Sequence, residues 1–188
     1  VGTLNAISFL ARNCRSKNHR EDLVRGLIDE GLEVHSMSSC LHNHPRPLSD
    51  DKIEIMRPYK FHAAFENGNL DDYVTEKVYT AFQAGTLPIY FGAPNIADFV
   101  PPHSIVNANT FKSVSALADH IRTLIHDDTL YASYFKWKTQ PNTAFTQRFA
   151  FTNVSTECRT CRWVYAKKYG LKWDHATQTV GFKRIQWL

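Results

Sequence analysis

The sequence predicts an α/β fold, with a doubly wound parallel sheet covered by helices on both faces. Short apolar runs of strand length alternate along the chain with segments whose apolar residues recur at helical spacing. This alternation is typical of βαβ units, in which the strands are parallel and each crossover helix covers one face of the sheet. Because no internal repeat or low-complexity tract interrupts the pattern, the 188 residues are expected to form one such domain with a partly irregular C-terminal extension.

The first half of the chain predicts two strands and two helices. Apolar residues recur at helical spacing over 23–28, and Gly31 follows where a C-terminal cap is expected. Ser49 is expected to cap a shorter helix, which Pro58 ends because proline disfavours helix at the residue before it. The expected elements are a strand over 4–11, a helix around 23–28, a strand over 33–36, a loop over 40–49 and a short helix that ends before Pro58.

The second half continues the alternation. Six apolar residues on one face over 114–125 predict an amphipathic helix, which is the strongest periodic pattern in the chain. Gly85 is expected to stop the preceding helix, and the tail after Gly170 shows no clear period. The expected elements are a strand over 61–65, a polar loop over 66–72, a helix over 75–84, strands over 87–91 and 105–106, and helices over 114–125, 129–138 and 158–169.

Composition and charge narrow the function classes. The formal net charge is +4, but the basic residues are scattered, whereas a nucleic-acid-binding surface usually clusters them. No apolar run approaches the length of about eighteen residues that a membrane-spanning helix needs, and no signal-peptide pattern is visible. The four cysteines and the sequon Asn153-Val154-Ser155, with Asn153 as the expected glycosylation site, favour an oxidising secretory lumen. Because the chain starts at Val1, it is expected to be a fragment of a longer protein.

A polar loop between a predicted strand and a predicted helix is the main candidate site. The loop over 66–72 leads to Thr75, Glu76 and Lys77 at the helix start. Ligands bind beyond the carboxyl ends of parallel strands, and the free N–H groups at a helix start favour an anion such as phosphate. Lys77 adds a positive charge there, and Glu76 suits a ribose diol because one carboxylate accepts two hydrogen bonds from it. The alternative is that Thr75 and Glu76 only cap the helix while Lys77 faces water.

Consecutive motif blocks in this region resemble the signature of the α1,3/4-fucosyltransferases, a glycosyltransferase family that uses GDP-fucose. The blocks are Tyr59-Lys60-Phe61, Phe65-Glu66-Asn67, Asp72-Tyr73-Val74-Thr75-Glu76-Lys77, Ala84-Gly85-Thr86-Leu87-Pro88 and Phe91-Gly92-Ala93-Pro94. Ala93-Pro94-Asn95-Ile96 is similar to the plant-type, core-modifying branch of the family. The resemblance extends from about Ala6 to about Tyr169, which is most of the chain.

This resemblance implies a domain organisation. The chain is expected to hold the Rossmann-like C-terminal half of a two-domain GT-B glycosyltransferase, with a GDP-fucose-binding domain over 1–157 and a Cys-x-x-Cys extension over 158–188. The N-terminal, acceptor-binding domain is expected to be absent from this chain, and with it a membrane anchor. The whole protein is then expected to be a single-pass type II membrane protein of the Golgi lumen.

The resemblance also implies roles for individual residues. Asn67, Tyr73, Glu76 and Lys77 match residues that contact GDP-fucose, with Glu76 on the ribose and Lys77 on the diphosphate, and Glu66 is expected to order the site. Lys17 stands where the family usually places a phosphate-binding arginine, and Lys lacks the two-pronged donor geometry that fits a phosphate. The nearby arginines that can substitute for it are Arg12, Arg15 and Arg20, unless all of these are surface charges.

The expected reaction is transfer of L-fucose from GDP-fucose, with inversion, to a GlcNAc-containing glycan in α1,3 or α1,4 linkage. A cationic pocket stabilises the departing diphosphate, so no divalent metal or other cofactor is expected, and no Asp-x-Asp occurs in the sequence. The carboxylate base that inversion needs belongs by analogy to the acceptor domain, so no residue here is assigned as catalytic. The fragment alone is expected to bind the donor without transferring fucose.

The cysteines leave two interpretations. Cys158 and Cys161 resemble a C-terminal cysteine pair that is a disulfide in the family, and Cys14 and Cys40 stand where plant-type relatives carry cysteines. The resemblance thus implies the pairs Cys14–Cys40 and Cys158–Cys161. The alternative is a zinc site made by Cys158, Cys161 and two residues from Cys40, His42 and His44, which would make the chain a non-catalytic zinc-bearing or basic interaction module.

Overall fold

The computed structural model describes residues 2–140, 145–146, 156–174 and 179–181. Its contacts divide the chain into two compact units, Val1–Pro141 and Asn142–Leu188, which are described separately below. The boundary predicted after residue 157 therefore falls inside the second unit. Asn153, the predicted glycosylation site, lies outside the described residues. Among the helices that the structure describes, none combines the length and apolarity needed to cross a bilayer.

The first unit is built on a five-stranded sheet in which every neighbouring pair is parallel. The strands lie in the order β2-β1-β3-β4-β5, so the direction of winding reverses between β1 and β3. The predicted α/β fold is confirmed, and this reversal marks the place where open parallel sheets bind ligands. The strands are β1 (Leu4–Phe9), β2 (Val34–Ser36), β3 (Tyr59–Phe65), β4 (Leu87–Phe91) and β5 (Val106–Asn107).

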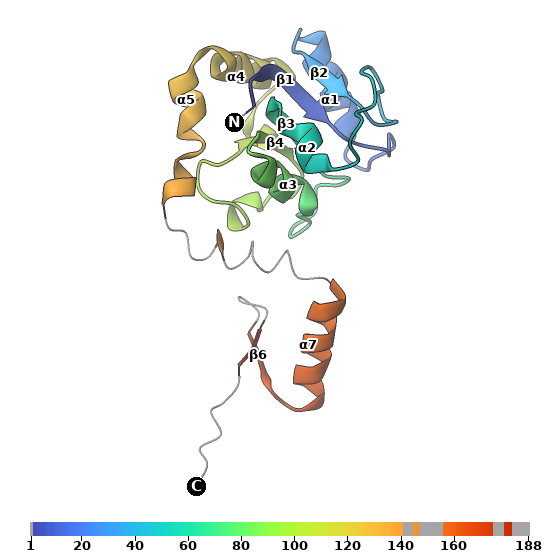
Figure 1. The fold of residues 1–188 in the computed structure, drawn as a ribbon, viewed down its shortest axis with the longest axis vertical. Helices are drawn as coiled ribbons and strands as arrows, with labels where there is room; N and C mark the ends of the chain where they lie inside the picture. Colours follow the sequence, from blue (N-terminus) through green and yellow to red (C-terminus); the bar gives the residue numbers. More distant parts are fainter. Residues whose placement is uncertain (1, 141–144, 147–155, 175–178, 182–188) are drawn as a thin grey trace. The chain divides into compact units, whose positions relative to one another are not determined.

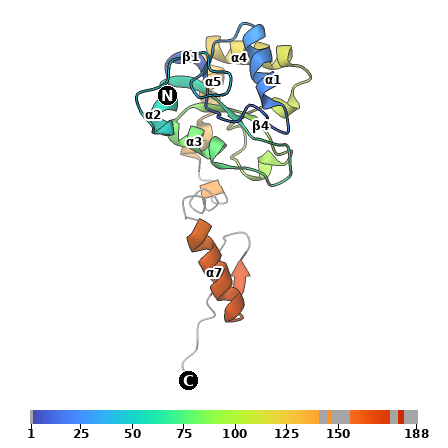
Figure 2. The ribbon, with the colours of Figure 1, turned by 90° about the vertical axis from the view of Figure 1, so that its right-hand side faces the viewer.

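Helices cover both faces of this sheet (Figures 1 and 2). On one face α1 (Arg20–Asp29) packs beside α4 (Val114–His126), which is followed by α5 (Asp128–Ser133). On the other face the short helix α2 (Lys52–Met56) packs beside α3 (Glu76–Ala84). The crossover through α1 runs in one direction from the reversal point and those through α2 and α3 run in the other, so the usual right-handed connection places them on opposite faces.

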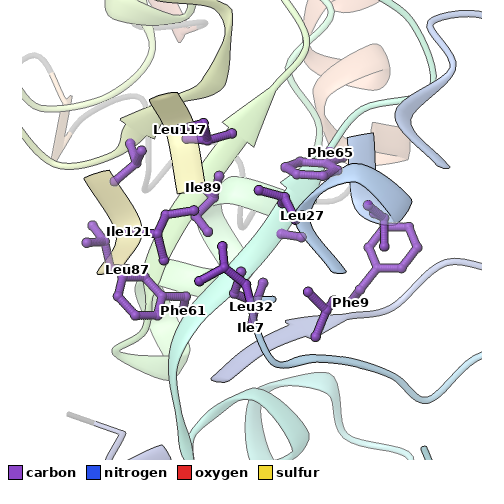
Figure 3. Packing of buried hydrophobic residues seen from close by; sticks show 14 of the residues in the cluster. Ile7, Phe9, Leu27, Leu32, Phe61, Phe65, Leu87, Ile89, Leu117 and Ile121 are labelled. Atoms are coloured by element: carbon purple, nitrogen blue, oxygen red, sulfur yellow. The ribbon is translucent and has the colours of Figure 1, made fainter. Parts of the chain in front are cut away.

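The main hydrophobic core lies between the sheet and the α1/α4 face (Figure 3). Phe61 pairs in register with Ile7 of β1 and Leu87 of β4, which places these apolar side chains in adjacent rows. Leu27 of α1 and Ile121 of α4 pack against them, and all five side chains are at most 1% exposed. The helical spacing read from the sequence therefore corresponds to the buried stripes of α1 and α4.

Several sequence-based expectations about helix ends are confirmed. Gly31 and Gly85 both have positive φ angles, of 81° and 80°, just after the ends of α1 and α3. Glycine adopts this left-handed conformation without the steric cost that a Cβ imposes, which is why it stops helices.

Other expectations about local structure are wrong. The short helix is capped by Asp51, whose carboxylate accepts from the N–H of Ile53 at 2.8 Å, and not by Ser49. The helix predicted over 129–138 ends at Ser133, and a separate 3₁₀ turn follows over Lys136–Thr139.

In the second unit, helix α7 (Thr156–Lys168) is found where a helix over 158–169 was expected. The tail in which no period was visible contains the antiparallel pair β6 (Lys172–Asp174) and β7 (Thr179–Gly181). Three-residue strands are too short to show a period of two clearly, so this hairpin leaves little trace in the sequence.

Candidate functional site

A fully buried carboxylate organises the loop between β3 and α3. Glu66, the residue after β3, is 0% exposed. Its Oε1 accepts from the Thr75 N–H at 2.8 Å, and its two carboxylate oxygens lie 2.9 Å from Thr75 Oγ1. Burying a charge is costly unless it is paired and hydrogen-bonded, and Glu66 meets both conditions. The ordering role expected for Glu66 corresponds to these bonds, which fix the start of α3 to the end of β3.

Lys77 supplies the charge partner of this carboxylate. Its Nζ lies 2.9 Å from Glu66 Oε2 and 2.7 Å from Thr75 Oγ1, and its side chain is 21% exposed. The Thr75 side chain makes no capping hydrogen bond to the helix. The alternative in which Thr75 and Glu76 only cap α3 while Lys77 faces water therefore fails for Thr75 and for Lys77. Lys77 is instead a fixed ammonium group at the carboxyl end of the sheet.

Glu76 lies next to Lys77 but faces outward. Its carboxylate is 59% exposed, with Oε1 at 3.9 Å from Lys77 Nζ and 3.8 Å from Lys52 Nζ. Burial tends to raise the pKa of Glu76, but the attraction of Lys77, a backbone hydrogen bond and the charge of Lys52 outweigh it and lower the pKa below its usual value. Glu76 is thus an ionised acceptor that hydroxyl groups of a ligand can reach.

Asn67 and Tyr73 occupy the loop itself, and both are partly exposed. The Oδ1 atom of Asn67 is buried and has no hydrogen-bond partner among the described residues. Tyr73 follows Asp72, whose φ angle of 62° is unusual for a residue with a Cβ. Asn95 holds Asp72 in this conformation, because its Oδ1 accepts from the Asp72 N–H at 3.0 Å and its Nδ2 donates to Asp72 Oδ1 at 2.9 Å. The sequence assigned no role to Asn95, and only the fold places it against a residue 23 positions away.

The loop after β1 contributes Lys17 and Arg20 in different ways. The Lys17 side chain is exposed, while its N–H donates to the carbonyl of Asn67 at 2.9 Å. A phosphate contact of Lys17 therefore stays a prediction. Arg20 is 3% exposed and donates to the carbonyls of Phe65 at 2.8 Å and Asn13 at 3.1 Å. Of the three arginines that can substitute for Lys17, Arg20 is the one fixed at the end of β3.

Local hydrogen bonds at the start of α1 explain the position of Arg20. Ser16 Oγ accepts from the Arg20 N–H at 3.0 Å and donates to Glu21 Oε2 at 2.6 Å. Asn18 Nδ2 donates to the Glu66 carbonyl at 3.1 Å, which joins the loops after β1 and β3. The loops that border the reversal point are thereby held in one arrangement.

Beneath this network is a buried histidine that the sequence did not identify. His62 on β3 is 3% exposed, and its Nδ1 lies 2.9 Å from Ser8 Oγ. Burial lowers the pKa of His62 to about 3, so the ring is neutral. Together with Glu76 and Lys77, His62 lines a hollow of about 30 Å³ between α2 and α3. Its sequence signal is weak, because a single histidine within a buried strand is more often a core residue than a functional one.

A larger cavity of about 630 Å³ adjoins this hollow and shares two residues with it, Leu10 and Lys52. It lies at the carboxyl ends of β1 and β2, beside the chain that leads into α2. Its remaining lining comprises Arg12, Met37, Ser38, Ser39, Arg46, Pro47, Ser49, Asp50 and Ile55.

Gly92 keeps space open for the buried carboxylate. A Cβ added at this position would lie 2.6 Å from Glu66 Cγ and 2.6 Å from Tyr90 Oη. Real Cβ atoms do not approach other atoms so closely, so only glycine fits here without movement. Within the motif Phe91-Gly92-Ala93-Pro94, the glycine is therefore needed for close packing against Glu66 as well as for the turn.

The cysteine predictions have two outcomes. The Cys14–Cys40 disulfide is confirmed, with a Cα–Cα distance of 5.0 Å, and it joins the segment after β1 to the segment after β2. The Cys158–Cys161 disulfide is wrong for this structure, in which both residues are exposed thiols within α7. Residues three apart on a helix hold their Cβ atoms about 5–6 Å apart, whereas a disulfide needs about 3.5–4.5 Å.

Cys40 is consequently not available to the zinc set considered from the sequence. Within the described ranges, no three or more His, Cys, Asp or Glu side chains are placed to hold a metal ion. The remaining members of that set are the histidines at 42 and 44 and the two exposed thiols of the second unit.

Comparison with known proteins identifies the class. Residues 4–179 match the family described as "Glycosyltransferase family 10 (fucosyltransferase) C-term", and this chain belongs to that family. The predicted resemblance is thus confirmed, and the alternative of a non-catalytic zinc-bearing or basic interaction module is wrong.

The relatives of this chain include fucosyltransferases whose names indicate different linkages and acceptors. An alpha-(1,4)-fucosyltransferase of Arabidopsis thaliana is 35% identical over 64% of this chain and 34% of its own length. GDP-fucose protein O-fucosyltransferase 3 of Mus musculus is 32% identical over 87% of this chain and 39% of its own length. A crystal structure of an alpha1,3-fucosyltransferase with GDP-fucose superposes with a TM-score of 0.63 and 30% identity, covering 69% of this chain and 37% of that one. This chain therefore spans about a third of the length of these relatives. The plant-type assignment stays a prediction, because plant and animal relatives are similarly close.

Proposed function

We propose that this chain forms the donor site of an inverting fucosyltransferase, which transfers L-fucose from GDP-fucose to an acceptor hydroxyl. The carrying observation is the pairing of an accessible, ionised Glu76 with a fixed ammonium group on Lys77 in the first turn of α3. An ionised carboxylate accepts hydrogen bonds from both hydroxyls of a ribose. The ammonium group beside it suits the diphosphate attached to the same ribose. The match to an alpha1,3-fucosyltransferase solved with GDP-fucose supports this assignment.

The proposed chemistry follows from where charge develops. As the bond between fucose and GDP breaks, negative charge builds on the departing phosphate oxygens. Fixed cations near those oxygens lower the barrier, because they need no reorganisation during the reaction. Lys77 and the buried Arg20 are cations fixed at the end of β3. These cations support the proposal that a divalent metal is not essential.

The proposal also covers the acceptor and the catalytic base of the reaction. We assign no catalytic base in this chain, and we place the carboxylate that deprotonates the acceptor in the acceptor-binding domain. A GlcNAc-containing glycan in α1,3 or α1,4 linkage is the proposed acceptor. The relatives include a protein O-fucosyltransferase, so a protein hydroxyl is the second candidate. Residence in the Golgi lumen is supported by the Cys14–Cys40 disulfide, because disulfides are typical of oxidising compartments.

Calorimetry on the 188-residue chain tests the donor site. We expect GDP and GDP-fucose to bind, and 2′-deoxy-GDP to bind about tenfold more weakly than GDP, because Glu76 then loses one charge-assisted hydrogen bond. A Glu76→Gln variant should bind both nucleotides with nearly equal affinity. Asp29→Asn, at the exposed end of α1, is the matched control for the lost charge. Absence of GDP binding at millimolar concentration would overturn the proposal.

A further inference from the structure

We propose that Asn95 is a positioning residue of the donor site, which orients Tyr73 toward the donor by fixing the backbone of Asp72. This inference rests on the proposed function, because Tyr73 is one of the residues expected to contact GDP-fucose. Neither the family match nor the named relatives assign a role to Asn95. Asn95 acts through the loop after β3 and is not itself proposed as a donor contact.

Asp72 adopts a backbone conformation that its own side chain disfavours. Its φ angle of 62° lies in the left-handed region, where a Cβ is crowded. Asp72 is the third residue of a turn in which the N–H of Tyr73 donates to the carbonyl of Leu70 at 3.2 Å. A second turn follows, in which the N–H of Val74 donates to the carbonyl of Asp72 at 2.9 Å. The direction in which the Tyr73 side chain leaves the loop therefore depends on the φ angle of Asp72.

Asn95 makes two hydrogen bonds that retain this conformation. Its Oδ1 accepts from the Asp72 N–H at 3.0 Å, and its Nδ2 donates to Asp72 Oδ1 at 2.9 Å. Because one planar amide bonds to both the backbone and the side chain of the same residue, it fixes the orientation of that residue as well as its distance. The same Nδ2 lies 3.5 Å from Asp98 Oδ2, so it faces a second carboxylate. An amide, which has both an acceptor and donors, therefore suits this position.

The segment that carries Asn95 is itself fixed to the end of β4. The N–H of Ala93 donates to the Tyr90 hydroxyl at 3.0 Å, and the N–H of Ile96 donates to the carbonyl of Ala93 at 3.2 Å. Tyr90 and Ile96 are at most 1% exposed. Asn95 thus connects a buried part of the sheet to a loop in which residues 69–72 are exposed.

Tyr73 is the residue of this loop whose orientation matters for the donor. It is partly exposed, and it lies close enough to the buried Arg20 to influence its charge. Burial lowers the pKa of Arg20, while the nearby acidic groups of Glu21, Glu66 and Tyr73 raise it. The phenol therefore lies near a fixed cation that is proposed to face the departing phosphate. A hydroxyl donates well to a phosphate oxygen only within a narrow range of distance and angle, so a shift of the loop weakens that contact.

Calorimetry with GDP-fucose on the 188-residue chain and its variants tests the inference. We expect Asn95→Ala to weaken GDP-fucose about tenfold, the size of one charge-assisted hydrogen bond from Tyr73. In a Tyr73→Ala background the same substitution should change the affinity by less than about twofold, because the contact that Asn95 supports is already absent. Asn5→Ala, at the exposed start of β1, is the matched control and should leave the affinity unchanged.

Asp72→Gly provides a rescue. Glycine adopts a positive φ angle without a hydrogen-bonded partner. Adding Asp72→Gly to Asn95→Ala should therefore restore most of the lost affinity, although neither side-chain bond of Asn95 returns. Asn95→Asp is a second variant, which keeps the size of the side chain but places a carboxylate against that of Asp72, and it should also weaken GDP-fucose. Thermal melting without nucleotide checks that each variant is folded.

The outcomes separate this inference from the proposed function. If the parent binds GDP-fucose and Asn95→Ala binds it equally well, the role of Asn95 is overturned while the donor site stands. If Asn95→Ala weakens binding by the same factor with and without Tyr73→Ala, Asn95 does not act through Tyr73 and the inference is overturned. If Asp72→Gly restores no affinity, the positive φ angle is not what Asn95 supplies, which also overturns it. If the parent does not bind GDP-fucose, the proposed function fails and the inference fails with it.

Discussion

Removal of Lys77 is the perturbation for which the structure gives the clearest magnitude. Breaking a buried ion pair by deleting one partner costs about 3–5 kcal/mol, because the remaining charge stays buried. Glu66 is 0% exposed but keeps hydrogen bonds from the N–H and hydroxyl of Thr75, and the Lys77 side chain is 21% exposed. We therefore expect Lys77→Met to lower the free energy of unfolding by about 2–3 kcal/mol, below the usual range.

Thermal unfolding without nucleotide measures this effect apart from ligand binding. For a domain of this size, 1 kcal/mol corresponds to about 2–4 °C, so the midpoint should fall by about 4–12 °C. Combining Lys77→Met with Glu66→Gln should recover part of the loss, because the buried charge is then removed, with a coupling energy of about 1–3 kcal/mol. Lys112→Met, at an exposed position, is the matched control and should change stability by at most about 0.5 kcal/mol.

Two results would refute the reasoning. A Lys77→Met midpoint within about 1 °C of the parent would mean that Glu66 does not depend on its ammonium partner. Strict additivity of the Glu66 and Lys77 substitutions would mean that the 2.9 Å contact between them carries no coupling.

Three further predictions concern the same domain. Replacing Cys14 and Cys40 by serine should destabilise the chain by about 3.5 kcal/mol in the chain-entropy view, for a sequence separation of 26, and reductant should lower the parent's melting midpoint but not the variant's. Gly92→Ala should cost about 1–3 kcal/mol in urea unfolding because its Cβ meets the buried carboxylate, whereas Gly68→Ala, with nothing within 4 Å, should cost far less; equal effects would contradict the packing reason. Folded His62 binds a proton only near pH 3, whereas His62 in the unfolded chain binds one below about pH 6.5. Lowering the pH from about 6.5 to about 3 should therefore reduce the free energy of unfolding by up to about 1.4 kcal/mol per pH unit. His62→Gln should show a shallower fall, and an unchanged slope would exclude His62 as the cause.

The local features of the fold are encoded within short stretches of sequence. Alternation of apolar runs is enough to predict the strands and helices of a parallel α/β sheet, because burial on both faces demands continuous apolar strands. Glycine is enough to predict where α1 and α3 stop, because the residue after each helix needs a positive φ angle. The sequence does not specify the N-terminal cap of α2, because Ser49 and Asp51 are both suitable capping residues and lie two positions apart.

The sequence alone placed Glu76 and Lys77 together at a strand-to-helix junction, since adjacent positions in one helical turn need no tertiary information. Only the tertiary structure decided what each does. The folded chain buries the Glu66 carboxylate and pairs it with Lys77, whereas the Glu76 side chain remains exposed to solvent. It brings Asn95 to Asp72 and Arg20 to the end of β3, over separations of 23 and 45 residues. Contacts at such separations depend on strand order and helix packing, which local propensity does not specify.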